Sequence, residues 1–140
     1  MNFDWAQRWL TSFGDLDQMM GMYDDNVQFE DIIFGEKARN KAELRHFFDA
    51  FSDPQAGRHS FRADSYSGGS TGGAVEWTWF ADHITDFLGV PAQGKHTETR
   101  GVSVLTFEDG KIIAQHDLWD AAAIYRQLGV VASGSRAAQA

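Results

Sequence analysis

Two long alternating segments joined by a tight turn constrain this chain more than any other feature. They run from Thr97 to Phe107 and from Lys111 to Trp119, with Glu108-Asp109-Gly110 between them. An acidic residue followed by glycine between two alternating runs is typical of a β-hairpin. Asp117 and Trp119 share one face of the second strand because they are two residues apart. A carboxylate beside a large aromatic side chain in apolar surroundings is a starting point for acid/base chemistry.

Three helices are expected before the long strands. Phe3 to Phe13 carries aromatic residues four apart, Leu16 to Tyr23 is rich in methionine, and Lys41 to Phe51 has an apolar stripe. Asp15 and Asn40 occupy the positions where helix N-caps are expected. Core packing is the favoured role for these stripes, although methionine also adapts well to the wall of a pocket.

The remaining elements complete a sheet. Val27 to Asp31 alternates as a short strand after a turn at residues 24–26, and Arg58 to Ser67 and Ala74 to His83 are expected to be longer strands. A short helix is expected after the final strand. This order predicts an α+β fold, with three N-terminal helices packed on one face of a curved, mostly antiparallel sheet. A sheet bent over helices forms a cone whose mouth suits a small apolar ligand.

Length and charge narrow the range of partners. The chain has 140 residues, so one domain over residues 1–130 is expected, followed by a flexible tail at residues 131–140. A net charge of −8 without a basic stripe disfavours nucleic acid and anionic membranes as partners. No window approaches the ~20 apolar residues of a membrane-spanning helix, so a cytoplasmic protein is expected.

No metal or cofactor is predicted from the sequence. The chain has no cysteine, which removes thiolate nucleophiles and cysteine-ligated metals. Its five histidines do not form the short spacings of common metal motifs. His116 alternates with Asp117 and is expected to face away from any cavity, whereas His83 and His96 flank the loop near the expected mouth.

Three stretches of the chain carry a family pattern in a fixed order. They are Gly14 to Asp31, Gly35 to Phe48, and Gly89 to Gly129. Together they resemble the SnoaL-like group of the nuclear-transport-factor-two-like superfamily, which includes polyketide cyclases, ketosteroid isomerases and limonene epoxide hydrolases. The resemblance implies a cone-shaped α+β barrel and a homodimer formed through the outer face of the sheet. Because these relatives catalyse different reactions, the function is argued from the site.

The resemblance also implies the roles of particular residues. It places the acid/base aspartate of polyketide cyclases at Asp117 and the proton-shuttling base of ketosteroid isomerases at Asp31. A strand-end or helix-capping role is the alternative for each. Two carboxylates facing one cavity would repel each other and raise at least one pKa. Ser103 is expected to donate a hydrogen bond to the developing enolate. The residues expected to shape the pocket are Trp9, Met19, Tyr23, Phe29 and Trp119.

The chain departs from each relative at some positions. Ser103 stands where ketosteroid isomerases have an acid and polyketide cyclases often have a histidine, and Phe3 to Phe13 contains no tyrosine. The stretch Glu76 to Trp79 lacks the Arg–x–Asp pattern of epoxide hydrolases, which makes epoxide hydrolysis the less favoured reaction. Within it, Trp77 and Trp79 share one face, where a core or interface role is favoured over stacking on a flat ligand.

The sequence therefore predicts a cofactor-free acid/base enzyme acting on a small apolar, ring-containing carbonyl compound. The expected outcome is aldol-type cyclisation, isomerisation or retro-aldol cleavage, with Asp117 moving the proton and Asp31 assisting. The alternative is a module of the same fold that binds a small molecule or dimerises without chemistry.

Overall fold

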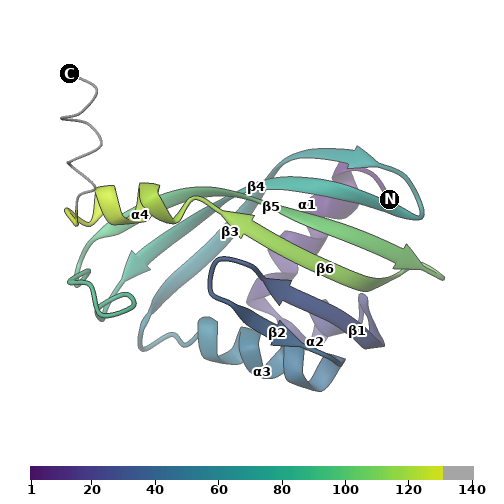
Figure 1. Cartoon of the computed structure of the whole chain (residues 1–140), viewed down its shortest axis with the longest axis horizontal. Coiled ribbons are helices and arrows are strands. Elements are labelled where there is room, and N and C mark those ends of the chain that lie inside the picture. The colour runs from purple at the N-terminus through teal and green to yellow at the C-terminus, as the bar shows by residue number, and fades with distance from the viewer. Residues whose placement is uncertain (131–140) are drawn as a thin grey trace.

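The computed structural model describes residues 1–130, so the tail expected at residues 131–140 lies outside the described part of the chain. One sheet and four α-helices make up the fold (Figure 1). In chain order the elements are α1 (Phe3–Thr11), a 3-10 turn (Ser12–Gly14), α2 (Leu16–Met20), β1 (Tyr23–Asp31), β2 (Glu36–Ala38), α3 (Lys41–Phe51), β3 (Gly57–Gly68), β4 (Gly72–His83), β5 (His96–Glu108), β6 (Lys111–Trp119) and α4 (Ala121–Gln127).

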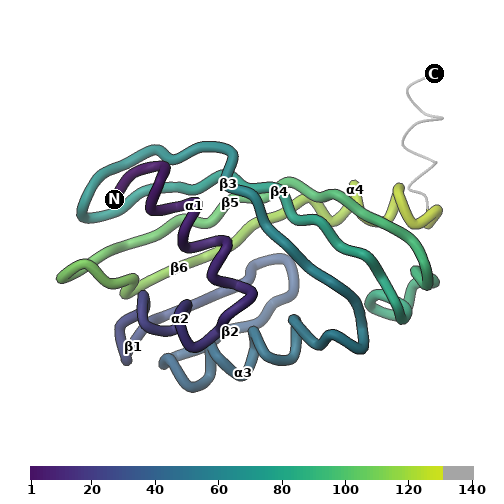
Figure 2. The backbone as a smooth tube through the Cα atoms, turned by 180° about the vertical axis from the view of Figure 1, so that it is seen from behind, coloured from purple at the N-terminus to yellow at the C-terminus, as the bar shows by residue number. Residues whose placement is uncertain are grey.

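The six strands form one curled, open sheet in the order β2-β1-β6-β5-β4-β3. Strands β3 to β6 follow one another antiparallel, β2 pairs antiparallel with β1, and β1 pairs in parallel with β6. Seen from behind in Figure 2, α1 crosses one face of this sheet and α3 runs along its lower edge. The predicted α+β cone with a mostly antiparallel sheet is confirmed.

Local sequence signals explain where the elements begin and turn. The Asp15 side chain accepts a hydrogen bond from the backbone N–H of Gln18, and Asn40 accepts one from Glu43, so both predicted N-caps are present. The β5–β6 hairpin turns at Asp109 and Gly110, whose φ angles are 52° and 76°. Two positive φ values are what a tight hairpin turn between right-twisted strands requires.

Two local predictions were wrong near the second helix. Residues 24–26 belong to β1, which begins at Tyr23, and α2 already ends at Met20. The signal misled because β1 is bulged: Tyr23 pairs with Ile112, but the next pair is Gln28 with Ala114. Within the bulge, the Asp24 side chain accepts a hydrogen bond from the backbone N–H of Asn26, a contact typical of turns. The short strand β2 was also not predicted.

Aromatic rings fill the core between the helices and the concave face of the sheet. Trp5 and Trp9 stack on each other along α1, with 5.6 Å between ring centroids, and Phe107 of β5 meets Trp5 edge-on. From α3, Leu44 is fully buried and Phe48 nearly so. These side chains fill the interior of the cone. The cone opens beside residues 85–88, which line a cavity there, and we call this opening its mouth.

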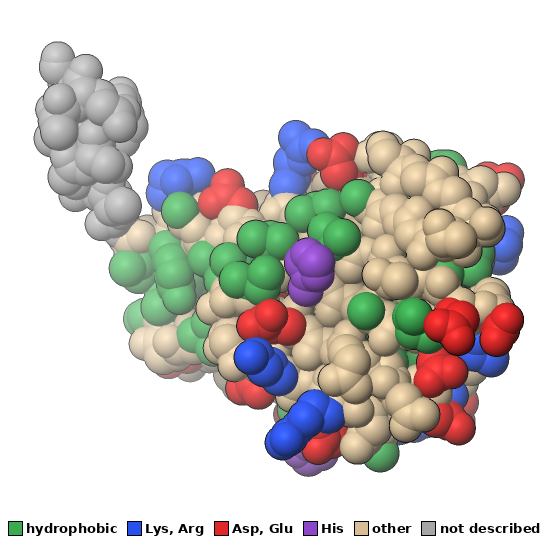
Figure 3. All heavy atoms as spheres, turned by 45° about the vertical axis from the view of Figure 1, so that its right-hand side comes forward, with side chains coloured by type: hydrophobic (Ala, Val, Ile, Leu, Met, Phe, Trp, Pro, Cys, Tyr) green, Lys and Arg blue, Asp and Glu red, His purple; other side chains and the backbone are tan. Residues whose placement is uncertain are grey.

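The outer face of the sheet carries partly exposed apolar side chains. Val104 of β5 and Leu118 of β6 each expose 37% of their surface. Hydrophobic side chains gather on this side of the molecule beside a histidine (Figure 3). His116 is exposed and pairs with Val104 across the strands, so it faces outward as predicted. Within residues 1–130, no helix combines the length and hydrophobicity needed to cross a membrane.

Candidate functional site

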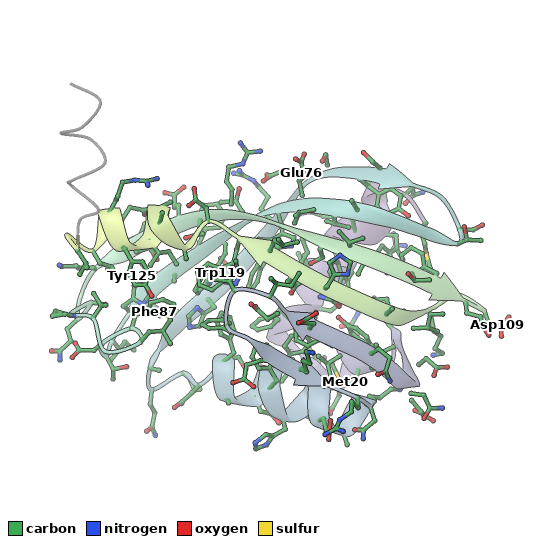
Figure 4. The ribbon with its side chains drawn as sticks, viewed as in Figure 1. Met20, Glu76, Phe87, Asp109, Trp119 and Tyr125 are labelled. Atoms are coloured by element: carbon green, nitrogen blue, oxygen red, sulfur yellow. The ribbon has the colours of Figure 1, made fainter. Side chains whose placement is uncertain are left out.

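An aromatic pocket lies between α3 and the concave face of the sheet. It holds about 50 Å³ of open space and is lined by nine aromatic side chains and by two carboxylates, those of Asp31 and Asp117. Trp119, labelled in Figure 4, stands at the end of β6, where its ring meets that of Phe34 from the β1–β2 turn at 4.9 Å. Such a wall offers few hydrogen bonds, so a charge placed inside is poorly solvated.

The pairing of β1 with β6 brings the two carboxylates together. Asp31 is the last residue of β1, and it stands directly opposite Asp117 in the parallel register. Neighbouring strands lie about 4.8 Å apart, so two side chains opposite each other on one face are close neighbours. The sequence separates these residues widely, and only the sheet places both in one pocket.

One carboxylate oxygen of Asp117 accepts two hydrogen bonds, and the other accepts none from residues 1–130. Its Oδ1 accepts hydrogen bonds from Ser103 Oγ at 2.6 Å and from Gln115 Nε2 at 2.9 Å. Its Oδ2 has no hydrogen-bond partner among residues 1–130. Burial raises the pKa of Asp117 to about 7, and the charge of Asp31 adds to this, while the bonds from Ser103 and Gln115 oppose it. Asp117 is thus set up to bind and release a proton near neutral pH.

Asp31 is held differently, because both of its oxygens accept hydrogen bonds. Oδ1 accepts from the backbone N–H groups of Ile33 and Phe34 at 3.0 and 2.9 Å. The indole Nε1 of Trp119 lies 3.1 and 3.2 Å from the two carboxylate oxygens. Burial raises the pKa of Asp31, and these donors oppose the rise by stabilising its ionised form. The two carboxylates therefore have distinct environments: Asp31 accepts hydrogen bonds on both oxygens, and Asp117 accepts them from residues 1–130 on Oδ1 alone.

A buried chain of hydrogen bonds supports Asp117 from behind. Trp9 Nε1 donates to the Tyr23 hydroxyl at 3.1 Å, and this hydroxyl donates to Gln115 Oε1 at 2.7 Å. An indole N–H can only donate, which fixes the direction of the whole chain and leaves the Gln115 amide to donate to Asp117. Sequence reasoning missed Gln115, although a polar residue two positions before Asp117 on an inward-facing strand was a usable signal.

Ser103 lies beside Asp117 and not at the surface of the pocket. Its Oγ accepts a hydrogen bond from Trp77 Nε1 at 2.9 Å and donates its only proton to Asp117. The expectation that Ser103 donates to a substrate enolate therefore does not fit this arrangement, because a hydroxyl has one proton to give.

The structure brings together only some of the side chains expected in the site. Asp31, Asp117 and Trp119 line the pocket. Four of the expected pocket residues are instead buried in the core and are not among the lining residues: Trp9, Met19, Tyr23 and Phe29. Phe29 packs on Phe47 and Phe48 of α3, with centroids 5.3 and 5.8 Å apart, so α3 separates it from the pocket.

Trp77 and Trp79 are buried in the core, in agreement with the favoured prediction. Both rings also line the pocket, which was not predicted. The alternation of β4 correctly placed them on one face, but alternation does not say which face of a sheet is concave.

Among the described residues, no group of three or more His, Asp or Glu side chains is arranged to hold a metal ion.

The raised pKa of Asp117 predicts a pH-dependent stability. The pKa is about 7 in the folded protein, compared with about 3.9 for a free aspartate. Its contribution to stability is therefore complete below about pH 4 and is lost as the pH rises through about 7. Asp117→Asn does not titrate, so its stability relative to wild type is expected to rise by about 2–4 kcal/mol between about pH 4 and pH 8.

Urea unfolding of both proteins at the two pH values measures this change. The quantity compared is the difference in unfolding free energy between the two proteins at each pH. Groups that titrate equally in both proteins do not contribute to this difference. A difference that does not vary with pH would show that Asp117 titrates like an aspartate in water.

The comparisons with known proteins agree with the resemblance seen in the sequence. A family model described as SnoaL-like polyketide cyclase matches residues 5–128. No curated protein sequence matches the chain.

Solved structures with the same fold come from several bacteria. A candidate polyketide cyclase from Xanthomonas campestris pv. campestris is 20% identical, with a TM-score of 0.77 over 88% of this chain and 93% of that one. A candidate SnoaL-like polyketide cyclase from Shewanella denitrificans OS-217 is 16% identical, with a TM-score of 0.76 over 89% and 93%. AclR, a candidate hydroxylase from Streptomyces galilaeus, is 18% identical, with a TM-score of 0.69 over 92% and 80%. At these identities the likeness concerns the fold.

Proposed function

Because the chain belongs to the SnoaL-like polyketide cyclase family, we propose that it is an acid/base enzyme acting beside a carbonyl group of a small, apolar, ring-containing substrate. One observation carries the proposal: Asp117, whose pKa is about 7, presents to an aromatic pocket an oxygen that accepts no hydrogen bond from residues 1–130. A general acid or base works best when its pKa is close to the working pH.

Asp117 would shuttle one proton between the substrate and its free oxygen. As a carboxylate, it takes the proton from a carbon next to the substrate carbonyl, which leaves an enolate and a neutral carboxylic acid. In aldol-type closure the enolate carbon bonds to a second carbonyl carbon, and the resulting alkoxide takes the proton back from Asp117. In isomerisation the proton returns to another carbon. The same steps in reverse cleave the carbon–carbon bond, so one site accommodates all three outcomes.

Asp31 would assist without carrying the proton. Its donors favour the ionised form, and its negative charge beside Asp117 makes Asp117 the stronger base. Its bond to Trp119 also holds an aromatic wall of the pocket in place. This division of roles follows from two neighbouring carboxylates placed in different environments.

Hydrogen–deuterium exchange tests the proposal directly. Wild-type protein in deuterated water is incubated with a panel of cyclic and aryl ketones, and loss of the C–H signal beside each carbonyl is followed by NMR. We expect faster exchange than in the buffer for at least one ketone that fits the pocket. Ketones whose signals shift on binding but never exchange would favour the alternative, a non-catalytic binding module of the same fold.

We also propose that the chain forms a homodimer through the outer face of the sheet. The partly exposed Val104 and Leu118 are diagonal neighbours on the outer face of β5 and β6, and a self-complementary patch on each copy is what a two-fold interface needs. Sedimentation at micromolar concentration is expected to give a dimer, and Leu118→Asp a monomer. Phe3→Asp, at an exposed apolar residue on α1, serves as the control and should leave the dimer intact. A monomeric wild type would contradict the proposal.

A further inference from the structure

A second cavity adjoins the aromatic pocket at the mouth of the cone. It holds about 300 Å³, and Phe34, Phe47 and Phe51 line both spaces. We call it the outer chamber; its other lining residues include His59, His83 and residues 85–88. Phe87 of this chamber and Trp119 of the inner pocket lie at the same end of the molecule, toward α4 (Figure 4). Since the inner pocket holds only about 50 Å³, most of a ring-containing substrate would occupy the outer chamber.

His59 presents a hydrogen-bond donor with a defined tautomer. Trp79 Nε1 donates to His59 Nδ1 at 3.0 Å. Because an indole N–H cannot accept, Nδ1 carries no proton, and the proton of the neutral ring is on Nε2. Nε2 has no hydrogen-bond partner within residues 1–130. Burial, reinforced by the nearby His83, lowers the pKa of His59 to about 4, so the ring is neutral at pH 7.

The other polar groups of the chamber disfavour an anion. The Nε2 of His83 pairs with Thr97 Oγ1 at 2.8 Å, and burial lowers the pKa of this histidine as well. Two acidic side chains, Glu36 and Asp86, also line the chamber, and no lysine or arginine of the described part of the chain does. A neutral N–H donor among carboxylates suits a neutral acceptor and repels a negatively charged one.

We propose that the outer chamber binds a neutral hydrogen-bond acceptor on the substrate, such as an amide, ester, ketone or hydroxyl oxygen, through His59 Nε2–H. His59 is then a specificity-determining residue, and a free carboxylate at the same position of the substrate is rejected. The inference deepens the proposed function, since it takes the occupant of the chamber to be the substrate of Asp117.

Three matched probes test the chamber without any turnover. They are 2-naphthamide, 2-naphthoate and unsubstituted naphthalene, and their binding is followed by the indole N–H signals of the protein in ¹H–¹⁵N NMR. We expect the amide to bind about tenfold more tightly than either of the other two, which is the effect of one hydrogen bond. The Trp79 indole signal should shift most, because it bonds to the histidine that the probe contacts.

Variants of His59 assign the preference to one side chain. His59→Phe keeps a ring against Phe51 but removes the N–H, so the amide preference should disappear. His59→Gln supplies an amide N–H of similar reach and should restore part of it. His46→Phe, at an exposed position of α3 away from the chamber lining, is the matched control and should retain the full preference. Equal binding of amide and naphthoate to wild type overturns the proposal even if His59→Phe does not fold.

Binding and catalysis fail separately in this design. Titrations of Asp117→Asn with the three probes are expected to show the same amide preference. In the separate assay with the ketone panel, this variant is expected to lose C–H exchange. An amide preference in a wild type that exchanges no ketone would count against the proposed function alone. Exchange in a wild type that binds amide and naphthoate equally would count against the role of His59 alone.

Discussion

Asp117→Asn is expected to lower the rate of C–H exchange beside the substrate carbonyl by about 100-fold or more, the usual contribution of a positioned acid/base group. Asparagine has nearly the same shape, and its side-chain oxygen can still accept from Ser103 and Gln115. Its amide cannot take up the proton, so only chemistry is removed. The measurement is exchange by NMR on the best ketone of the panel, with ligand binding recorded in parallel.

Asp109→Asn is the matched control for this substitution. Asp109 lies at the tip of the β5–β6 hairpin, far from Trp119 in Figure 4, and its φ of 52° suits asparagine well. It should exchange the ketone at the wild-type rate. If Asp117→Asn itself stays within about tenfold of wild type, Asp117 is not the proton carrier, and Asp31→Asn then becomes the informative variant.

Gly101→Ala is expected to destabilise the protein by about 1–3 kcal/mol, the usual cost of overpacking a close-packed site. Gly101 of β5 lies between Trp77 of β4 and Trp119 of β6 in the sheet register. A Cβ added at Gly101 would overlap the six-membered ring of Trp77. Because Trp77 also lines the pocket and donates to Ser103, its displacement should weaken ketone binding as well as lower the free energy of unfolding.

The control for Gly101→Ala is the same substitution at Gly14, where an added Cβ meets nothing within 4 Å. Urea unfolding of both variants measures the difference. The double variant Gly101→Ala/Trp77→Phe should recover part of the loss, because the smaller ring vacates the space that the new methyl group needs. Equal stability of Gly101→Ala and Gly14→Ala would show that Trp77 can move without cost.

The contrast between the two carboxylates depends on backbone geometry as much as on side chains. Asp31 ends β1, and the turn that follows points the N–H groups of Ile33 and Phe34 at its Oδ1. Asp117 lies inside β6, where the ladder already uses the neighbouring N–H groups. Only side chains remain to bond it, and they reach one oxygen. The same residue type therefore meets backbone donors at a strand end and only side-chain donors within a strand, so hydrogen bonds oppose the burial-raised pKa differently at the two sites.

Local patterns were sufficient for most of the long elements. The caps at Asp15 and Asn40, and the alternation on both sides of Asp109-Gly110, depend on neighbours in sequence, so they could be predicted. Local patterns gave a wrong prediction at residues 24–26, because the bulge in β1 is set by its pairing with β6. A three-residue strand such as β2 carries too few positions for alternation to be seen.

The sequence by itself determined the α+β class, the order of the long elements and the shared face of Asp117 and Trp119, because the two-residue period of a strand is intrinsic to its backbone. Only the tertiary structure decided that Asp31 stands opposite Asp117, that Gln115 and Ser103 bond one of its oxygens, and that Trp77 and Trp79 face the pocket. Strand pairing, the direction of sheet curvature and desolvation all depend on residues distant in the chain. The pKa of Asp117 depends on all three, so it belongs to the fold and not to any segment of the sequence.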